Sequence, residues 1–344
     1  MKILAINGTP MDSIIRTILP YISTDGFNQT SKYEWIETIF PMVYRLGFGP
    51  YRTFRLTVEE NETVSELTVK AVRGTRFKRK HAVFNTSSKP NYALELLDEH
   101  TALFRHSYFV SSFFKQVTGK EYQTFLDSAF AVLKREGIKN LILDIRTNGG
   151  GQEGMENLLF SYLVKEPTQK YAYVAAPAAF ANIEDYTDER ETIKQDGWQP
   201  DSTGSYRRGH HTLMSNYYSE FKDYHQPDTS LVFDGKVYVL IGGDVFSGGA
   251  EFASLLRMTN RAVFIGEETG GAYEGNVSGY FEHPKLPHSK IEIRFPYVKF
   301  RMNVEPETPG RGVMPDYPVS TDCADFARGR DTQLEFTKEL IETN

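Results

Sequence analysis

The serine at position 247 has the sequence surroundings of a catalytic nucleophile. It follows an apolar run, residues 237–241, that is typical of a buried strand, and it precedes a segment whose apolar residues have helical spacing. A serine at such a strand-to-helix turn can expose its hydroxyl beside the N–H groups of the helix start, where the helix dipole favours an oxyanion. An ordinary βα unit with Ser247 as the helix N-cap fits the same pattern. From this stretch alone, both interpretations are open.

A second glycine-rich stretch favours the catalytic interpretation. Three consecutive glycines, 149–151, follow a predicted short strand at 141–145 and precede a predicted helix at 155–163. Without side chains, their N–H groups can point into a cleft and bind an anion. The run lacks the Gly-Lys-Ser/Thr ending of a P-loop and the spacing of a dinucleotide fingerprint. We therefore expect no nucleotide at this bend.

The composition indicates a globular protein without a nucleic-acid partner. The chain has 344 residues, of which 40% are hydrophobic, and a net charge of −6; this length suffices for roughly two domains, and the charge argues against nucleic acid. The single cysteine, Cys323, excludes an internal disulfide and a cysteine-clustered zinc site. No apolar run has the length of a membrane span, and the first residues lack a signal-peptide pattern. We expect neither a metal nor a cofactor.

Strand and helix patterns alternate along most of the chain. Residues 101–109 and 141–145 are predicted as strands with an amphipathic helix, 123–136, between them, an order that indicates a parallel βαβ unit. Residues 1–75 have the pattern of a smaller α+β unit. Its predicted elements are a strand at 3–6, a turn at 7–8, helices at 11–19 and 31–46, and paired strands at 54–58 and 66–72. Later elements are strands at 262–265 and 291–295 and a closing helix at 331–343.

Two segments interrupt this alternation. Residues 73–81 carry five basic residues and are interpreted as a solvated linker between folded parts. Residues 167–230 are polar and aromatic, and an inserted segment of this length is typical of a lid or a binding excursion. It contains the pair His210-His211. Adjacent side chains diverge and no third ligand is apparent, so we interpret both histidines as solvated rather than metal-binding.

Four motifs occur in the same order as in peptidase family S41, which comprises the C-terminal processing and tricorn-like proteases. The sequence therefore resembles this family, and more narrowly its members of the Bacteroidetes type. The motifs are residues 141–151, similar to a strand with a DxRxNxGG element; 245–247, similar to the nucleophile element; 265–271, similar to IGExTxG; and 312–316, similar to GVxPD. The resemblance implies an α/β catalytic domain of the ClpP/crotonase-like ββα-spiral type over residues 82–344. It also implies a PDZ-like module, incomplete at its start, over residues 1–75. The insertion at 167–230 would be a lid-like segment of the catalytic domain.

The resemblance further implies a serine peptidase acting on peptides or proteins. Carried over by motif, Ser247 is the nucleophile. The Gly248 N–H and one N–H from residues 149–151, with Gly150 favoured, would form the oxyanion hole, each donor stabilising the tetrahedral intermediate by roughly 3 kcal/mol. The periplasm or cell envelope is the compartment that the resemblance suggests. Nothing in the sequence indicates an oligomeric state.

The general base departs from the family pattern. Ala272 stands where the processing branch has a lysine, so no Ser–Lys dyad is available. The tricorn-like branch takes a histidine from a region ahead of the PDZ-like module, and we expect the base outside this chain. Glu305 lies where that branch has a supporting glutamate. His100 imitates the histidine motif but is interpreted as structural or solvated, and Glu251 as a surface or helix charge.

Two other functions remain as alternatives. The missing base and the aromatic insertion fit a non-catalytic protein that binds peptides or hydrophobic ligands on the same scaffold. A crotonase-type acyl-CoA enzyme would share the fold and a paired N–H oxyanion hole. It is disfavoured because nothing in the sequence suggests a nucleotide site.

Overall fold

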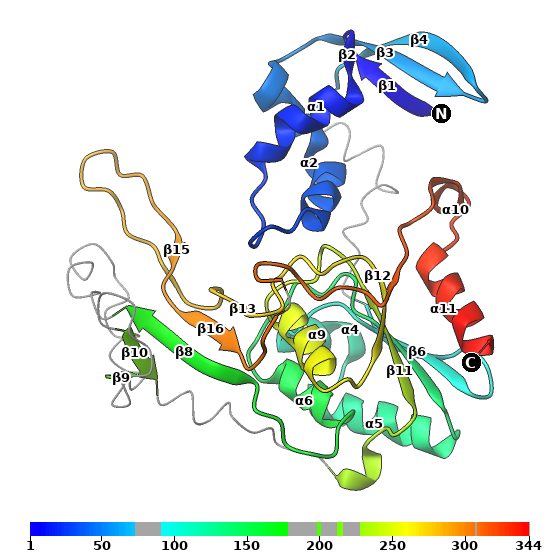
Figure 1. Ribbon diagram of the computed structural model, residues 1–344, viewed down its shortest axis with the longest axis vertical. Coiled ribbons are helices and arrows are strands. Elements are labelled where there is room, and N and C mark those ends of the chain that lie inside the picture. Colours follow the sequence, from blue (N-terminus) through cyan, green and yellow to red (C-terminus); the bar gives the residue numbers. More distant parts are fainter. Residues whose placement is uncertain (73–90, 178–197, 201–211, 216–227, 307, 344) are drawn as a thin grey trace. The chain divides into compact units, whose positions relative to one another are not determined.

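The computed structural model describes residues 1–72, 91–177, 198–200, 212–215, 228–306 and 308–343. The chain divides into two compact units, unit 1 with Met1–Thr24 and Ser31–Lys89 and unit 2 with Asp25–Thr30 and Pro90–Asn344 (Figure 1). The predicted basic linker and the pair His210-His211 lie outside the described residues. No helix in the described ranges combines the length and apolar composition needed to cross a bilayer.

Unit 1 is a four-stranded antiparallel sheet with two main helices. Its strands are β1 (Lys2–Ile6), β2 (Thr9–Pro10), β3 (Thr53–Glu60) and β4 (Thr63–Lys70), in the order β2-β1-β3-β4. Two-residue turns at Asn7-Gly8 and Asn61-Glu62 have positive φ at both positions, as tight hairpins require. The helices are α1 (Met11–Ile18) and α2 (Thr30–Phe48), and α1 is followed by the short η1 (Leu19–Tyr21). The predicted turn at 7–8 and the predicted strand pair are confirmed.

A six-stranded sheet forms the centre of unit 2, in the order β17-β12-β11-β7-β6-β5. Its strands pair in parallel except for β5, which is antiparallel to β6. They are β5 (Tyr92–Leu96), β6 (Thr101–His106), β7 (Asn140–Asp144), β11 (Lys236–Ile241), β12 (Val263–Gly266) and β17 (Tyr317–Pro318). The predicted parallel βαβ unit, β6 to β7, is confirmed, and the fold is α/β as expected. Strands β5 and β17 were not predicted.

Helices cover both faces of this sheet (Figure 1). Leu141 and Leu143 on β7 pack into the core under helices α5, α6 and α9, whereas Ile142 packs into a second core under α11. This alternation follows from the two-residue repeat of a strand that is buried on both faces. The helices of unit 2 are α4 (Ser111–Thr118), α5 (Tyr122–Arg135), α6 (Met155–Ser161), α9 (Gly248–Met258), α10 (Cys323–Ala327) and α11 (Thr332–Glu342), with the short η5 (Thr229–Leu231). Of these, α4, α10 and η5 were not predicted.

A second, antiparallel sheet of unit 2 has the order β13-β16-β8-β10-β9. Its strands are β8 (Tyr171–Pro177), β9 (Trp198–Pro200), β10 (Thr212–Ser215), β13 (Gly275–Asn276) and β16 (Lys299–Met302). Strands β8, β9 and β10 thus belong to the predicted insertion, most of which lies outside the described residues, and its role as a lid stays a prediction. The strand predicted at 291–295 is wrong in extent: β15 (Phe295–Pro296) pairs with β14 (Phe281–Glu282), and before it Glu292 forms only an isolated bridge with Lys285.

Residues 25–30 belong to unit 2 although they interrupt unit 1 in sequence. The Phe27 N–H donates to the Gly310 carbonyl oxygen (2.8 Å), and the Asn28 side-chain amide donates to the Thr269 carbonyl oxygen (2.6 Å). Because of these bonds, residues 25–30 group with unit 2, whereas the sequence analysis placed all of residues 1–75 in one module.

Candidate active site

The parallel strands bring Ser247 and the glycine bend to one edge of the sheet. The carboxyl ends of β7 and β11 lie side by side, because Leu240 pairs with Asp144. The bend at 148–151 leaves β7, and the loop that ends at Ser247 leaves β11. A backbone hydrogen bond from Phe246 N–H to the Asn148 carbonyl oxygen (3.1 Å) joins the two segments. The two stretches that the sequence singled out are therefore neighbours.

Ser247 lies on a sharp turn between β11 and α9. Its backbone has φ 48° and ψ −130°, a conformation that non-glycine residues rarely adopt and that is characteristic of strained functional sites. It occupies the N-cap position of α9, but its hydroxyl makes no capping hydrogen bond. The hydroxyl is thus available for another role, and the turn has the character of a nucleophile elbow.

The glycine bend packs directly against Ser247. A Cβ on Gly150 would lie 2.5 Å from the Ser247 Cβ and 2.8 Å from the Gly248 nitrogen, and Gly150 has a φ of +95°. The Gly150 N–H, however, donates to Asn148 Oδ1 at 2.9 Å. It is therefore not free to bind an oxyanion, contrary to our expectation. The N–H groups of Gly149, Gly151 and Gly248 have no hydrogen-bond acceptor among the described residues.

His106, at the carboxyl end of β6, holds Asn148 in place. Its ring is fully buried, with Nε2 3.0 Å from the Tyr122 hydroxyl and Nδ1 3.3 Å from Asn148 Nδ2. Because the amide donates to Nδ1, we assign the ring proton to Nε2. Burial lowers the pKa of His106 to about 3, so the ring is neutral at physiological pH. His106 supports the bend and was missed by the sequence analysis.

This buried imidazole predicts an acid-sensitive component of stability. Below about pH 6.5 the unfolded chain protonates His106, whereas the folded protein does so only near pH 3, so the stability is lost as the pH falls through that interval. The expected loss is about 3 kcal/mol by pH 4. Urea unfolding from pH 7 to 4 should show a clearly flatter pH dependence for H106Q than for the unsubstituted protein. Parallel curves for the two proteins would contradict this role.

The Ser247 hydroxyl has a second serine as its partner. Ser278 Oγ lies 3.1 Å from Ser247 Oγ and 2.5 Å from Asn276 Oδ1. Asn276 Nδ2 in turn donates to Glu251 Oε1 at 2.7 Å. Strand β13 positions Asn276, and α9 carries Glu251 one turn after Ser247. Neither Ser278 nor Asn276 was predicted from the sequence. Glu251 was interpreted as a surface or helix charge; it does lie on α9, but it is buried and not at the surface.

Behind Glu251 lies a cluster of three carboxylates around one ammonium group. The fully buried Lys170 Nζ lies 2.7 Å from Glu153, 2.6 Å from Glu156 and 2.6 Å from Glu251. Burial alone would lower the pKa of Lys170, but the three carboxylates outweigh it and raise the pKa. Burial would likewise raise the pKa of Glu251, yet Lys170 and the Tyr171 hydroxyl outweigh it and lower the pKa. Both groups are therefore charged.

The three carboxylates could together hold a metal ion on geometry alone, since one oxygen of each lies within 4.8 Å of the others. The Lys170 ammonium group, however, lies within hydrogen-bond distance of all three. It supplies the positive charge that a metal ion would otherwise supply. The cluster is thus better described as a buried ion-pair network than as a metal centre.

Charged residues of the sequence motifs hold the surrounding loops together. The Arg146 guanidinium bridges Asp144 (2.7 Å) and Asp331 (2.6 Å), which caps α11. Burial would raise the pKa of Asp331, but Arg146 outweighs it and lowers the pKa. Glu268 accepts two hydrogen bonds from Arg311 (2.8 and 2.6 Å). These motif residues hold the loops around Ser247 in place through ion pairs and hydrogen bonds.

Among the described residues, the recorded hydrogen bond of the Ser247 hydroxyl is with Ser278 and with none of the other candidate residues. Glu305 is exposed, and its carboxylate pairs with no described residue. The Ala272 N–H donates to Asp25 Oδ2 (3.3 Å), and its methyl side chain offers no base. His100 is exposed just before β6, at the opposite edge of the sheet from Ser247, in agreement with its interpretation as a solvated residue.

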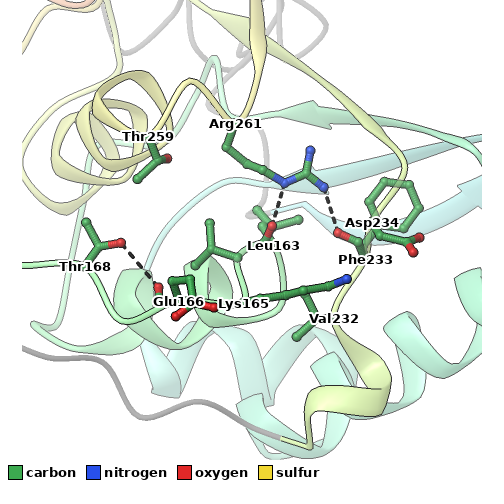
Figure 2. A pocket seen from close by; sticks show the side chains of 10 residues that line it. Leu163, Lys165, Glu166, Thr168, Val232, Phe233, Asp234, Thr259 and Arg261 are labelled. Carbon is green, nitrogen blue, oxygen red and sulfur yellow. Dashed lines mark hydrogen bonds between the residues drawn. The ribbon is translucent and has the colours of Figure 1, made fainter.

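A separate cavity of about 330 Å³ lies near the opposite edge of the sheet, before β11 and β12 begin. Figure 2 shows the Arg261 guanidinium hydrogen-bonded to the carbonyl oxygens of Leu163 (2.5 Å) and Phe233 (2.7 Å) in its wall. These bonds already use much of the hydrogen-bonding capacity of the guanidinium group. The cavity does not adjoin Ser247, which follows the other end of β11.

Comparison with known proteins identifies the family. The profile of peptidase family S41 matches residues 109–319, more than half of the chain, and the chain therefore belongs to this family. Family S41 peptidases are serine-type hydrolases of peptide bonds, and this is the class of the protein. None of the curated proteins matches the sequence.

Three solved structures are similar to this chain. Mature CPAF complexed with lactacystin has 13% identity and a TM-score of 0.60 over 98% of this chain and 76% of that one. Mature CPAF has 14% identity and a TM-score of 0.62 over 94% and 72%. A putative peptidase from Parabacteroides merdae has 18% identity and a TM-score of 0.47 over 97% and 89%. The CPAF structures support the fold.

Proposed function

We propose that this S41 peptidase cleaves peptide bonds with Ser247 as its nucleophile. The observation that carries the proposal is the strained turn at Ser247, whose hydroxyl caps no helix and lies beside an unpaired Gly248 N–H. A strained backbone conformation of this kind costs about 1–3 kcal/mol. Because of that cost, such conformations are found mostly at functional sites. The hydroxyl would attack the scissile carbonyl and form an acyl-enzyme.

The Gly248 N–H and the Gly151 N–H are the proposed oxyanion donors. Phe109 lies on the β6 side of the bend. The Gln152 N–H donates to the Phe109 carbonyl oxygen, and the Phe109 N–H donates to the Gly150 carbonyl oxygen. N–H groups of successive extended residues point to opposite sides, so the Gly151 N–H is directed away from Phe109. That is the side of β11 and Ser247 in the sheet order. Gly151 thereby replaces Gly150 in the role that the sequence suggested.

The finer fold assignments and the mode of substrate binding are also part of this proposal. We assign unit 2 to the ClpP/crotonase-like ββα-spiral type and unit 1 to a PDZ-like module. In unit 1, β4 is an edge strand with only exposed residues, which suits the addition of an extended peptide strand. An extended segment of a polypeptide is thus the substrate class that the proposal favours.

The general base would come from outside the described residues. Ser247 Oγ has Ser278 as its hydrogen-bond partner among them, and a hydroxyl is too weak a base to accept its proton. A histidine that approaches to about 2.6–3.2 Å would meet the geometric requirement. Glu305 remains the candidate to support such a histidine, since its carboxylate is exposed and unpaired among the described residues.

Degradation of an unfolded protein substrate tests this function. The full-length protein should hydrolyse the substrate, and S247A should lower the rate by at least about 10³-fold, because the nucleophile is lost. Ser289, an exposed loop serine, provides the matched control, and S289A should keep full activity. Equal rates for S247A and the unsubstituted protein would rule out Ser247 as the nucleophile.

A non-catalytic peptide-binding protein is the second candidate. It is favoured by one observation, namely that Ser278 rather than a base is hydrogen-bonded to Ser247. Saturable binding of a peptide by the full-length protein, with no cleavage and no modification of Ser247 by a fluorophosphonate, would support this candidate over the first.

A further inference from the structure

We propose that Ser278 is a positioning residue for the reaction, a hydroxyl that transfers its hydrogen bond from Asn276 to Ser247 as negative charge develops on the nucleophile. The inference rests on the proposed role of Ser247. It assigns a function to a residue that none of the four sequence motifs contains.

The geometry gives Ser278 two acceptors for one proton. Its Oγ lies 2.5 Å from Asn276 Oδ1 and 3.1 Å from Ser247 Oγ. A hydroxyl carries a single donor, so only one of these bonds can use the Ser278 proton at a time. The shorter contact assigns that proton to Asn276 in the resting protein. Ser247 Oγ is the second acceptor within reach of the Ser278 hydroxyl.

Asn276 is held firmly enough to act as the resting acceptor. Its Oδ1 also accepts the Ser278 N–H (2.9 Å), and its Nδ2 donates to Glu251 (2.7 Å). Glu251 is in turn fixed by Lys170 (2.6 Å) and the Tyr171 hydroxyl (2.8 Å). The buried ion-pair network therefore sets the position of the Ser278 oxygen relative to the nucleophile.

The proposed switch moves a hydrogen bond and transfers no proton between the serines. When the base removes the Ser247 proton, that proton goes to the base and the electron pair stays on Ser247 Oγ. Hydrogen bonds to a charged oxygen are about twice as strong as those to a neutral one. The Ser278 hydroxyl then rotates from the neutral amide oxygen to Ser247 and keeps its own proton. The amide of Asn276 is not basic, so Ser278 is not the general base.

The rate at which a fluorophosphonate modifies Ser247 tests the inference. In the full-length protein, S278A should slow this reaction about 10- to 100-fold, the range for losing one hydrogen bond to a charged group. S278T keeps a hydroxyl and should stay within about threefold of the unsubstituted rate. The pH profile for S278A should move upward by about one unit or more, because the donor that stabilises the anion is lost. A purely structural role would not move that profile.

Controls separate failure of this inference from failure of the proposed function. Val277 is the exposed neighbour in the same loop, and V277A should react at the unsubstituted rate. If S278A does not fold, S278C is measured in its place with the same expectation. No modification of Ser247 in the unsubstituted protein overturns the proposed function. Normal modification there, with an equal rate and pH profile in S278A or an equally slow rate in S278T, overturns the role of Ser278 alone.

Discussion

Alanine at position 150 should abolish most of the peptidase activity. The added Cβ would lie 2.5 Å from the Ser247 Cβ and 2.8 Å from the Gly248 nitrogen, both too close for non-bonded atoms, and the φ of +95° is itself strained for alanine. Either Ser247 or the glycine bend must shift by several tenths of an ångström. Misplacement of this kind costs about 100-fold or more in rate. We expect a stability loss of about 1–3 kcal/mol as well.

The neighbouring glycine is the matched control. A Cβ on Gly149 would meet only the Tyr108 ring, at 3.3 Å, and Gly149 does not have a positive φ. G149A should therefore keep its stability within about 1 kcal/mol and lose much less activity than G150A. Peptide hydrolysis and urea unfolding of both variants measure the difference. Equal losses in the two variants would mean that contact of Gly150 with Ser247 does not set the geometry of the site.

Removing the Lys170 ammonium group should cost about 3–5 kcal/mol of folding stability, since breaking a buried ion pair leaves uncompensated charge. In K170M, the buried carboxylates of Glu156 and Glu251 would face each other without the cation that lies 2.6 Å from both. Activity should fall too, because Glu251 holds Asn276. Chemical unfolding of K170M and of the exposed-residue control K139M measures the effect.

A double variant shows whether the cost comes from charge. If the orphaned carboxylates are the cause, K170M/E156Q should recover part of the stability that K170M loses, although it changes one more buried residue. A double variant less stable than K170M would indicate that lost packing, and not unpaired charge, dominates.

The sequence predicted the elements that follow local rules. Alternation of strand and helix patterns placed β6, α5 and β7 correctly, and the Asn7-Gly8 turn followed from residue type. The neighbourhood of Ser247 and the glycine bend could be expected because both follow buried strands, and parallel strands bring their carboxyl ends to one edge. These predictions needed no knowledge of side-chain packing.

The rest depends on contacts between distant segments. Glu251 looked like a surface charge because its partner Lys170 lies far away in sequence, just before a strand of the second sheet. Ser278 follows the two-residue strand β13, which has no apolar pattern to reveal it. The Gly150 N–H is hydrogen-bonded only because of the rotamer of Asn148, and the buried His106 sets that rotamer. No spacing rule encodes such a chain of hydrogen bonds.

Mapping the covalent adduct of a fluorophosphonate on the full-length protein by peptide mass spectrometry tests the assignment of the nucleophile directly. The structure leads us to expect one adduct per chain, on the peptide that contains Ser247, and no adduct in S247A. An adduct on a different serine, or none while peptide bonds are still being hydrolysed, would contradict the account.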